Sequence, residues 1–322
     1  MKKLWLLLDN RMGSVGQAKG VALKLEKDFE IIEKQINYNR FAKLPNILKF
    51  KSLIGIKKES KTTISQNFPD LIISASRRTA PVAQWIKKQS PTTKIIQLMH
   101  PGNYGLKDFD LVFVPHHDKG HRKETSNITY IFGAPHRLSQ QKLKEAKQQW
   151  QKTFAHLPQP LTAVLVGGGA SLNEENATKL GKELKTLKNK FGGSILITTS
   201  KRTGEKPTQL ILNEIKDIPS HQYIWGQTQD QENPFMGYLA CADNVVVTGD
   251  SVSMPSEACG TSKPVFIFLS NYGLKTKQID FVKSLCNKKY ACLLNDENAH
   301  NFKPQTILDT AKFIADKTLT LF

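Results

Sequence analysis

The sequence has little of what marks several common protein classes. Its four cysteines lie far apart and form no CxxC pair; they are Cys241, Cys259, Cys286 and Cys292. This spacing argues against a zinc ribbon or a disulfide framework and fits a reducing cytoplasm. No run approaches the roughly 20 apolar residues that a membrane-spanning helix needs. The apolar stretch at residues 4–8 is too short for a signal peptide, so it predicts a buried strand.

Acidic residues are few relative to basic ones. The 322 residues include 46 Lys and Arg against 28 Asp and Glu, a formal net charge of +18. Such an excess favours an anionic partner, either a membrane face or a phosphorylated substrate. No RNA-binding or DNA-binding signature accompanies the charge, so nucleic acid is not an expected partner.

Strand and helix patterns alternate along the chain, which predicts parallel sheets covered by helices. Predicted strands are residues 4–8, 70–74, 94–99, 111–114, 129–132, 161–166, 194–199, 223–224, 244–248 and 265–268. Predicted helices are residues 15–27, 80–88, 140–153, 173–191, 207–216 and 304–322. Two prolines in residues 156–160 predict a linker. We therefore expect an α/β protein with two Rossmann-like domains facing a cleft, at residues 1–155 and 161–303, followed by a helix at 304–322.

The most informative segment runs from Asp243 to Thr261. A β-branched run ends in Thr248-Gly249-Asp250-Ser251, and a helix is predicted to begin near Pro255. A strand, a small polar loop and a helix N-terminus together present backbone N–H groups to an anion. Glu257, expected in the first turn, could bind the two hydroxyls of a ribose. The alternative is an ordinary βα unit with a well-capped helix.

Two other strand ends in the second half predict phosphate contacts. The three glycines Gly167–Gly169 would let a pyrophosphate approach closely, with Ser171 capping the next helix. They lack the Gly-Lys-Ser/Thr ending of an ATPase P-loop. Lys201 and Arg202 follow another strand and suit phosphate oxygens, since arginine grips them in a bidentate fork. A plain solvated turn is the alternative.

The first half carries similar strand ends. After the first strand, Gly13 and Gly16 would permit a tight turn, but the spacing is not G-x-G-x-x-G, so bound NAD is not expected. A plain βα turn is the alternative. Arg77 and Arg78 precede a helix, where they repel each other unless an anion or carboxylate joins them. His100 follows a further strand and is a candidate base or a structural hydrogen-bonding group.

One histidine cluster raises the question of a metal. His117 and His121 are four residues apart, and Asp118 lies beside the first. Pro115 and Gly120 disfavour a helix there, and no remote ligand is indicated, so we expect no metal site. A loop that contacts substrate through Asp118 or a histidine is the favoured interpretation.

A basic and apolar stretch spans residues 40–58, from Arg40 to Lys58. It could lie on an anionic bilayer, with lysines at the headgroups and apolar groups below them. The alternative is a helix that packs its apolar side onto its own domain.

Together these segments resemble the mitochondrial-fission "elongated mitochondria" family, which is similar in turn to GT-B glycosyltransferases. The matching pieces run nearly end to end, at residues 9–17, 76–79, 97–102, 115–118, 166–169, 199–203 and 248–258. The resemblance implies two Rossmann-like domains, a nucleotide-sugar site mostly in the second, and a last helix that crosses back to the first.

We therefore expect a metal-independent glycosyltransferase without a cofactor, whose substrates are a nucleotide-diphosphate sugar and a lipid-linked or cell-envelope acceptor. It would be cytoplasmic or peripheral on the inner face of the membrane. Asp9 or His100 would deprotonate the acceptor. Donor-binding candidates are Gly167, Gly168, Gly169, Ser200, Arg202, Thr203, Asp250, Ser251, Ser253, Met254, Ser256 and Glu257. Acceptor or cleft candidates are Arg11, Gly13, Ser14, Gln17, Arg77, Arg78, Thr79, His117 and Asp118.

Two other functions remain open from the sequence. One is a non-catalytic adaptor that binds a membrane or a protein, favoured by the charge and by residues 40–58. The other is a nucleotide-sugar epimerase that shares the two-domain architecture and needs no oxidoreductase cofactor.

Overall fold

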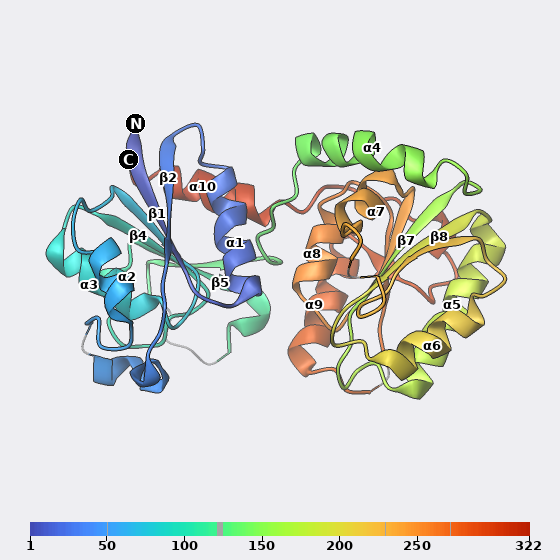
Figure 1. Ribbon diagram of the computed structural model, residues 1–322, viewed down its shortest axis with the longest axis horizontal. Helices are drawn as coiled ribbons and strands as arrows, with labels where there is room; N and C mark the ends of the chain where they lie inside the picture. Colours follow the sequence, from blue (N-terminus) through green and yellow to red (C-terminus); the bar gives the residue numbers. More distant parts are fainter. Residues whose placement is uncertain (50, 121–124, 229, 271) are drawn as a thin grey trace. The chain divides into compact units, whose positions relative to one another are not determined.

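A computed structural model describes residues 1–49, 51–120, 125–228, 230–270 and 272–322. The chain divides into two compact units. Unit 1 comprises Met1–Arg137 and Asp309–Phe322, and unit 2 comprises Leu138–Leu308. Each unit is an α/β domain built on a parallel six-stranded sheet, which confirms the predicted fold class (Figure 1).

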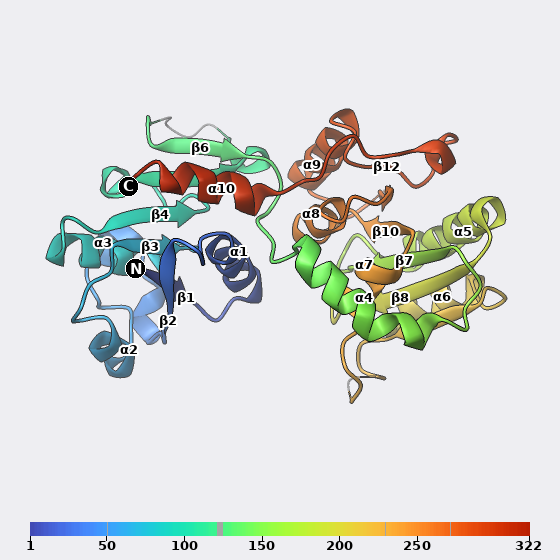
Figure 2. The same cartoon turned by 90° about the horizontal axis from the view of Figure 1, so that it is seen from above.

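Unit 1 has the strand order β2-β1-β3-β4-β5-β6. Its strands are β1 (Lys2–Leu8), β2 (Phe29–Gln35), β3 (Leu71–Ser74), β4 (Lys94–Leu98), β5 (Leu111–Pro115) and β6 (Ile128–Ile131). Its helices are α1 (Met12–Leu23), α2 (Lys58–Thr63), α3 (Ala80–Gln89) and α10 (Thr310–Leu319). Helices α1 and α10 lie on one face of the sheet, and α2 and α3 lie on the other (Figures 1 and 2).

The alternation of side chains along β1 explains this double cover. Leu4, Leu6 and Leu8 point into a core that also holds residues of α1 and α10. Trp5 and Leu7 point into the opposite core, with α3. A strand buried on both faces is continuously apolar, which is why residues 4–8 were recognisable.

The last helix returns to unit 1, as the resemblance predicted. Ala311 and Ile314 are buried in the core with α1. The helix is shorter than the predicted 304–322 segment. The Asp309 side chain accepts a hydrogen bond from the Lys312 N–H at 2.9 Å, so the helix begins at Thr310. Asp309 also pairs with Lys24 at 2.7 Å, which fixes this start against unit 1.

Unit 2 has the strand order β12-β11-β10-β7-β8-β9. Its strands are β7 (Leu161–Val166), β8 (Ser194–Thr199), β9 (Ser220–Tyr223), β10 (Asn244–Thr248), β11 (Val265–Phe268) and β12 (Cys292–Leu293). Its helices are α4 (Gln140–Phe154), α5 (Glu174–Phe191), α6 (Glu205–Glu214), α7 (Phe235–Cys241), α8 (Ser253–Cys259) and α9 (Thr276–Asn287).

The boundary between the units differs from the predicted one. Helix α4 belongs to unit 2, where its Phe154 ring lies 5.5 Å from the Tyr238 ring of α7. A Cβ on Gly237 would come within 2.3 Å of Trp150 Cγ, so only glycine lets the two helices pack this closely. The chain therefore changes unit after Arg137, before α4, and not within residues 156–160.

Candidate functional site

The strand order places a site in unit 2 at the carboxyl ends of β7 and β10. From β7 the chain moves to β8 and β9 on one side, and later returns to β10 on the other side of β7. The connections after β7 and β10 therefore lead to opposite sides of the sheet, and ligands of open parallel sheets bind where strand order reverses in this way. The predicted donor segments, Gly167–Gly169 and Thr248–Ser251, are these two loops.

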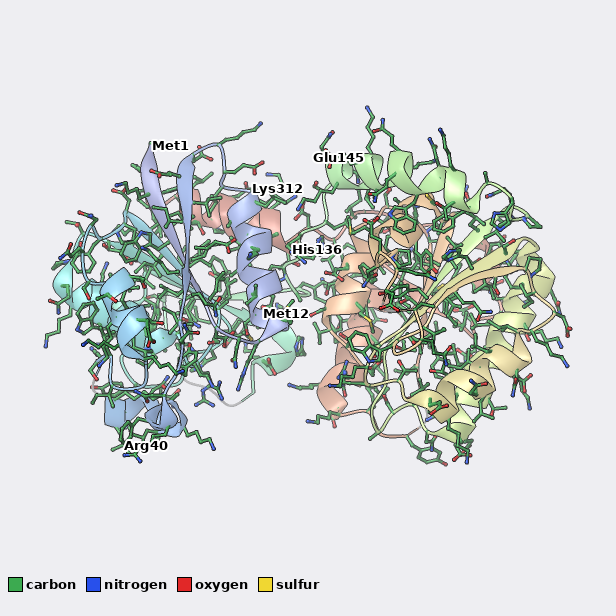
Figure 3. The ribbon with its side chains drawn as sticks, viewed as in Figure 1. Met1, Met12, Arg40, His136, Glu145 and Lys312 are labelled. Atoms are coloured by element: carbon green, nitrogen blue, oxygen red, sulfur yellow. The ribbon has the colours of Figure 1, made fainter. Side chains whose placement is uncertain are left out.

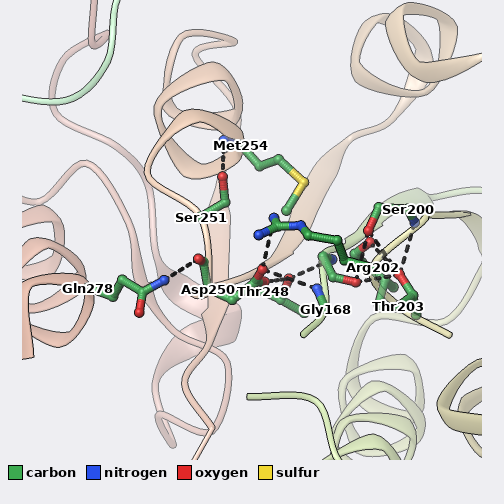
Figure 4. A network of polar contacts seen from close by, with 11 residues as sticks. Gly168, Ser200, Arg202, Thr203, Thr248, Asp250, Ser251, Met254 and Gln278 are labelled. Carbon is green, nitrogen blue, oxygen red and sulfur yellow. Dashed lines mark hydrogen bonds and ion pairs between the residues drawn. The ribbon is translucent and has the colours of Figure 1, made fainter. Parts of the chain in front are cut away.

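The backbone N–H groups of the glycine loop are already hydrogen-bonded within the chain (Figure 4). Gly167 N–H donates to Thr248 Oγ1 at 2.8 Å, and Gly168 N–H to Asp250 Oδ2 at 3.1 Å. Gly169 N–H donates to the Arg202 carbonyl at 2.8 Å. These three N–H groups are therefore not free donors here, and the predicted close approach of a pyrophosphate to the glycines stays a prediction.

Packing explains why the loop needs glycine. Gly168 has φ 159°, and a Cβ there would lie 2.2 Å from the Arg202 carbonyl oxygen. A Cβ on Gly167 would lie 2.1 Å from Asp250 Oδ1. These glycines bring the loop after β7 into direct contact with the loops after β8 and β10.

Asp250 braces the three loops. Its side chain is 5 % exposed, and Oδ1 accepts a 2.6 Å hydrogen bond from the Thr248 hydroxyl. Oδ2 accepts from Gly168 and lies 3.4 Å from Arg202 Nη2. Gln278 donates to the backbone carbonyl of Asp250. The role of Asp250 is thus to hold the loops together, which the sequence did not predict.

Thr203 and Ser200 complete this network. The Thr203 hydroxyl is buried and donates to the carbonyls of Gly167 and Val166, and it accepts from Ser200 N–H at 2.9 Å. The half-buried Ser200 hydroxyl donates to the Gly167 carbonyl at 3.2 Å. Thr203 and Ser200, both predicted to bind the nucleotide sugar, therefore support the loops directly.

Two cations remain on the surface of this edge. The Arg202 side chain is 61 % exposed although one of its nitrogens contacts Asp250, and Lys201 is also exposed. Ser251 is half-buried, and its hydroxyl accepts a long 3.4 Å hydrogen bond from Met254 N–H. Of the residues predicted to bind the nucleotide sugar, Arg202 and Ser251 are among those with side chains accessible to an anion, and Lys201 beside them is accessible too.

Helix α8 begins earlier than predicted, at Ser253. Ser253 and Met254 therefore occupy its first turn, and Glu257 lies in the second turn and not the first. Glu257 is half-buried. Ser256 is fully buried, and its hydroxyl donates to the Val252 carbonyl at 2.7 Å, so it serves the helix itself.

A cavity of about 360 Å³ opens beside this network. It is lined by Thr199, Ser200, Lys201, Gly204, Glu205, Thr208, Ile224, Trp225, Gly226 and Gln227. Ile224 and Trp225 form an apolar wall, and Trp225 is 49 % exposed. Trp225 N–H donates to Thr199 Oγ1 at 3.0 Å, which fixes the wall to the end of β8. Ser200 and Lys201 of this lining were predicted from the sequence, whereas Ile224 and Trp225 were not, although a tryptophan just after a strand was an available signal.

Unit 1 has a corresponding edge at the carboxyl ends of β1 and β3. The strand order reverses there, between β1 and its neighbours β2 and β3. Asp9 follows β1 and is only 2 % exposed. Its Oδ1 accepts from Arg11 N–H at 3.0 Å, whereas Oδ2 has no hydrogen-bond partner among the described residues.

Tyr38 lies close enough to this carboxylate to feel its charge. Burial first, and then the charge of Asp9, raise the pKa of Tyr38 well above its usual range. Arg78 lies over the Tyr38 ring, 5.6 Å from its centroid. Arg77 is exposed, and the buried Thr79 hydroxyl bonds Ser74 Oγ at 2.7 Å within the turn. Of the predicted residues of this turn, Arg78 is thus the one that contacts the Tyr38 ring.

The predicted glycine turn after β1 does not occur. Helix α1 begins at Met12, so Gly13, Ser14, Gly16 and Gln17 are helical, and neither glycine has a positive φ. A Cβ on Gly13 or Gly16 would meet nothing within 4 Å. Their effect is to leave two positions in the first turns of α1 without a side chain.

His100 is buried after the end of β4. Met99 turns the chain with a left-handed φ of 66°, and His100 Nδ1 accepts from Gly102 N–H at 3.1 Å. His117 Nε2 lies 3.8 Å from Asp118 Oδ2 in a short 3₁₀ turn. His121 lies outside the described residues. Within those ranges no group of three His, Cys, Asp or Glu side chains is placed to hold a metal.

The network predicts a strong effect of removing the Asp250 carboxylate. Asp250→Ala leaves the Gly168 N–H and the Thr248 hydroxyl buried without their acceptor, so the free energy of unfolding should fall by roughly 2–4 kcal/mol. Urea denaturation measures this loss. The neighbouring Ser251→Ala, which removes one long hydrogen bond, should stay within about 0.5 kcal/mol of wild type. Equal losses in the two variants would contradict the bracing role.

Two solved structures share the architecture. UDP-GlcNAc 2-epimerase from Neisseria meningitidis, solved with UDP-GlcNAc, has a TM-score of 0.57 and 15 % identity, covering 99 % of this chain and 100 % of that one. The Methanocaldococcus jannaschii UDP-GlcNAc 2-epimerase has a TM-score of 0.58 and 12 % identity, with the same coverage. Identities this low establish similarity of fold alone.

Sequence comparison identifies the family. A protein of Rickettsia prowazekii, itself uncharacterised, is 30 % identical over 97 % of this chain and 96 % of its own length. The mitochondrial fission protein ELM1 of Arabidopsis thaliana is 33 % identical over 72 % of this chain, which spans 58 % of the plant protein. The family model described as "Mitochondrial fission ELM1" matches residues 12–322. The chain therefore belongs to the ELM1 mitochondrial fission family, as its motifs indicated, and has a GT-B-like fold.

Proposed function

We propose that unit 2 binds a nucleotide-diphosphate sugar and that the protein transfers the sugar to an acceptor hydroxyl. The cavity beside Trp225 carries this proposal, because it adjoins the reversal of strand order between β7 and β10. Ser200 connects the cavity to the loop after β7, because it lines the cavity and its hydroxyl donates to the Gly167 carbonyl. A ligand with an aromatic base at one end and a diphosphate at the other fits such a continuous surface.

The base would lie in the cavity against Trp225. Its exposed indole offers a stacking surface, and Ile224 adds an apolar wall. The ribose would be bound by Glu257, whose half-buried carboxylate can accept hydrogen bonds from two hydroxyls. Fold similarity to a UDP-GlcNAc-bound epimerase supports a nucleotide sugar as ligand.

The diphosphate would be held by side chains. The backbone N–H groups of Gly167, Gly168 and Gly169 are engaged, so Arg202 and Lys201 supply the positive charge, with Ser251 as a further donor. An arginine fork stabilises the charge that develops on a departing diphosphate. This arrangement assigns no role to a metal ion.

Asp9 is the preferred base. Its buried Oδ2 has no partner among the described residues, so it can accept a proton from an acceptor hydroxyl. The acceptor oxygen would then bond to the anomeric carbon as the bond to the diphosphate breaks. The negative charge leaves on the nucleoside diphosphate. His100 is the second candidate base, and a lipid-linked or cell-envelope molecule is the expected acceptor.

Epimerisation of the nucleotide sugar is the second candidate function. Similarity to the two epimerases extends over essentially the whole chain, with TM-scores above 0.5. An epimerase converts the free nucleotide sugar without an acceptor, whereas a transferase releases a nucleoside diphosphate only as an acceptor is consumed. Product analysis with and without acceptor separates the two.

Nucleotide affinity should depend on Trp225. Trp225→Ala removes the stacking surface, worth about 1–3 kcal/mol for a base on an aromatic ring, so Kd for UDP should rise at least fivefold. Isothermal titration calorimetry measures the change. Tyr272→Ala is the control, because Tyr272 is an exposed aromatic residue outside the cavity lining. An unchanged Kd in Trp225→Ala would count against the base site. Absence of binding across a panel of nucleoside diphosphates would favour the adaptor.

Turnover should depend on Asp9 without a change in nucleotide affinity. Asp9→Asn keeps the side-chain shape but removes the base, so kcat should fall by about 10²–10⁴-fold while Kd for UDP stays constant. Asp28→Asn is the control, since Asp28 is an exposed aspartate just before β2. Full turnover in Asp9→Asn would exclude Asp9 as the base and favour His100.

A further inference from the structure

An exposed apolar surface lies in unit 1 within residues 41–54. Its side chains and their exposed fractions are Phe41 43 %, Leu44 37 %, Ile47 54 %, Leu48 49 % and Ile54 44 %. They are five of the 13 large hydrophobic residues that are exposed in the described ranges of the chain. Such clustering on a monomer marks an interaction surface, whereas single exposed apolar residues do not.

The conformation differs from the helix that was the alternative interpretation of residues 40–58. The described part forms two short 3₁₀ turns, η1 (Arg40–Lys43) and η2 (Asn46–Lys49). The side chains of a four-residue 3₁₀ segment point in several directions, so they cannot all pack against the segment's own domain. The apolar groups are therefore presented to solvent.

Side-chain hydrogen bonds to backbone carbonyls hold the turns in place. Asn39 Nδ2 donates to the carbonyls of Ile54 and Ile56, at 2.8 and 3.0 Å, which closes the base of the loop. Lys49 is 4 % exposed, and its ammonium donates to the Ala42 carbonyl at 2.9 Å and joins η2 to η1. Asn46 Nδ2 donates to the carbonyls of Arg77 and Pro101. The apolar surface is thus displayed by a loop with its own internal supports.

The charge around this surface has one sign. Arg40, Lys43, Lys57 and Lys58 are exposed, and residues 40–58 contain no Asp or Glu. Lys51 is paired with Asp108 at 2.8 Å, so it contributes little to the excess. Exposed apolar groups flanked by unpaired lysines match the headgroup and acyl boundary of an anionic bilayer.

We propose that the described residues of this stretch, 40–49 and 51–58, form a docking surface for an anionic lipid bilayer. The composition favours lipid over a protein partner, because centres of protein interfaces are rich in Tyr, Trp and Arg and depleted in Lys. Among the described residues of this stretch, Phe41 is the one aromatic side chain in the exposed apolar group, and lysine supplies most of the charge. The described part of the chain contains no helix long and apolar enough to cross a membrane. The proposal stands independently of the proposed function.

The surface lies toward the carboxyl ends of the parallel strands of unit 1. Figure 3 shows Met1 and Arg40 at opposite ends of this unit. Met1 precedes the start of β1, so Arg40 lies toward the carboxyl ends of the parallel strands, the side on which Asp9 follows β1. Docking would bring that side toward the lipid.

Flotation of the full chain with vesicles tests the proposal. The protein should float with vesicles of phosphatidylcholine and phosphatidylglycerol, and poorly with phosphatidylcholine alone. Ile47→Ser with Leu48→Ser should abolish flotation. Arg40→Gln with Lys43→Gln should weaken binding roughly fivefold per charge, because each basic residue near an anionic surface contributes about 1 kcal/mol.

Matched variants separate a local surface from general charge and hydrophobicity. Ile307→Ser with Leu319→Ser removes an isoleucine and a leucine exposed by 44 and 37 % elsewhere, and should float like wild type. Lys144→Gln with Lys152→Gln removes two exposed charges from α4 and should also bind normally. Equal losses in test and control pairs, or no flotation of wild type with anionic vesicles, would overturn the proposal. Thermal unfolding and UDP affinity should be unchanged in all four variants.

Discussion

The buried carboxylate of Asp250 joins three loops, and the candidate site of unit 2 depends on that junction. It accepts hydrogen bonds from Thr248 and Gly168 and pairs with Arg202, so the strand-end loops after β10, β7 and β8 form one body. The glycines make this possible, because any Cβ on Gly167 or Gly168 would collide with Asp250 or Arg202. Because the N–H groups of the glycine loop are already hydrogen-bonded, an anion at this site would have to be bound by side chains, chiefly those of Arg202 and Lys201.

The two units have different strand orders, but each has a reversal of strand order beside its first strand, with a buried aspartate at that edge. Both oxygens of Asp250 are hydrogen-bonded, which makes it structural. Asp9 keeps one oxygen without a partner among the described residues, which leaves it available for proton transfer. The two aspartates thus differ in their hydrogen bonding: Asp250 is a structural carboxylate, and Asp9 is a candidate general base.

The sequence predicted the elements that are buried on both faces and the strand ends that carry polar residues. It did not predict β2, because this strand forms the edge of the sheet and its residues are mostly polar or only partly buried. It placed α4 in the wrong unit, because only the contact of α4 with α7 shows where that helix belongs. Motif spacing located the glycine loop and Thr248–Ser251. It could not show that the Thr248 hydroxyl, the Asp250 carboxylate and the Arg202 carbonyl would each accept a hydrogen bond from one N–H group of that loop. Trp225 was missed for a similar reason, since its place in a cavity arises from strands β8 and β9 and the start of α6.

A crystal structure of the protein with UDP would show whether this edge of unit 2 is a nucleotide site. We expect the pyrimidine ring against Trp225, the ribose hydroxyls on Glu257, and the diphosphate within hydrogen-bonding distance of Arg202. The loops around Asp250 should keep their hydrogen bonds, because they are satisfied before the ligand arrives. UDP bound elsewhere, or crystals grown with saturating UDP that hold none, would contradict the assignment.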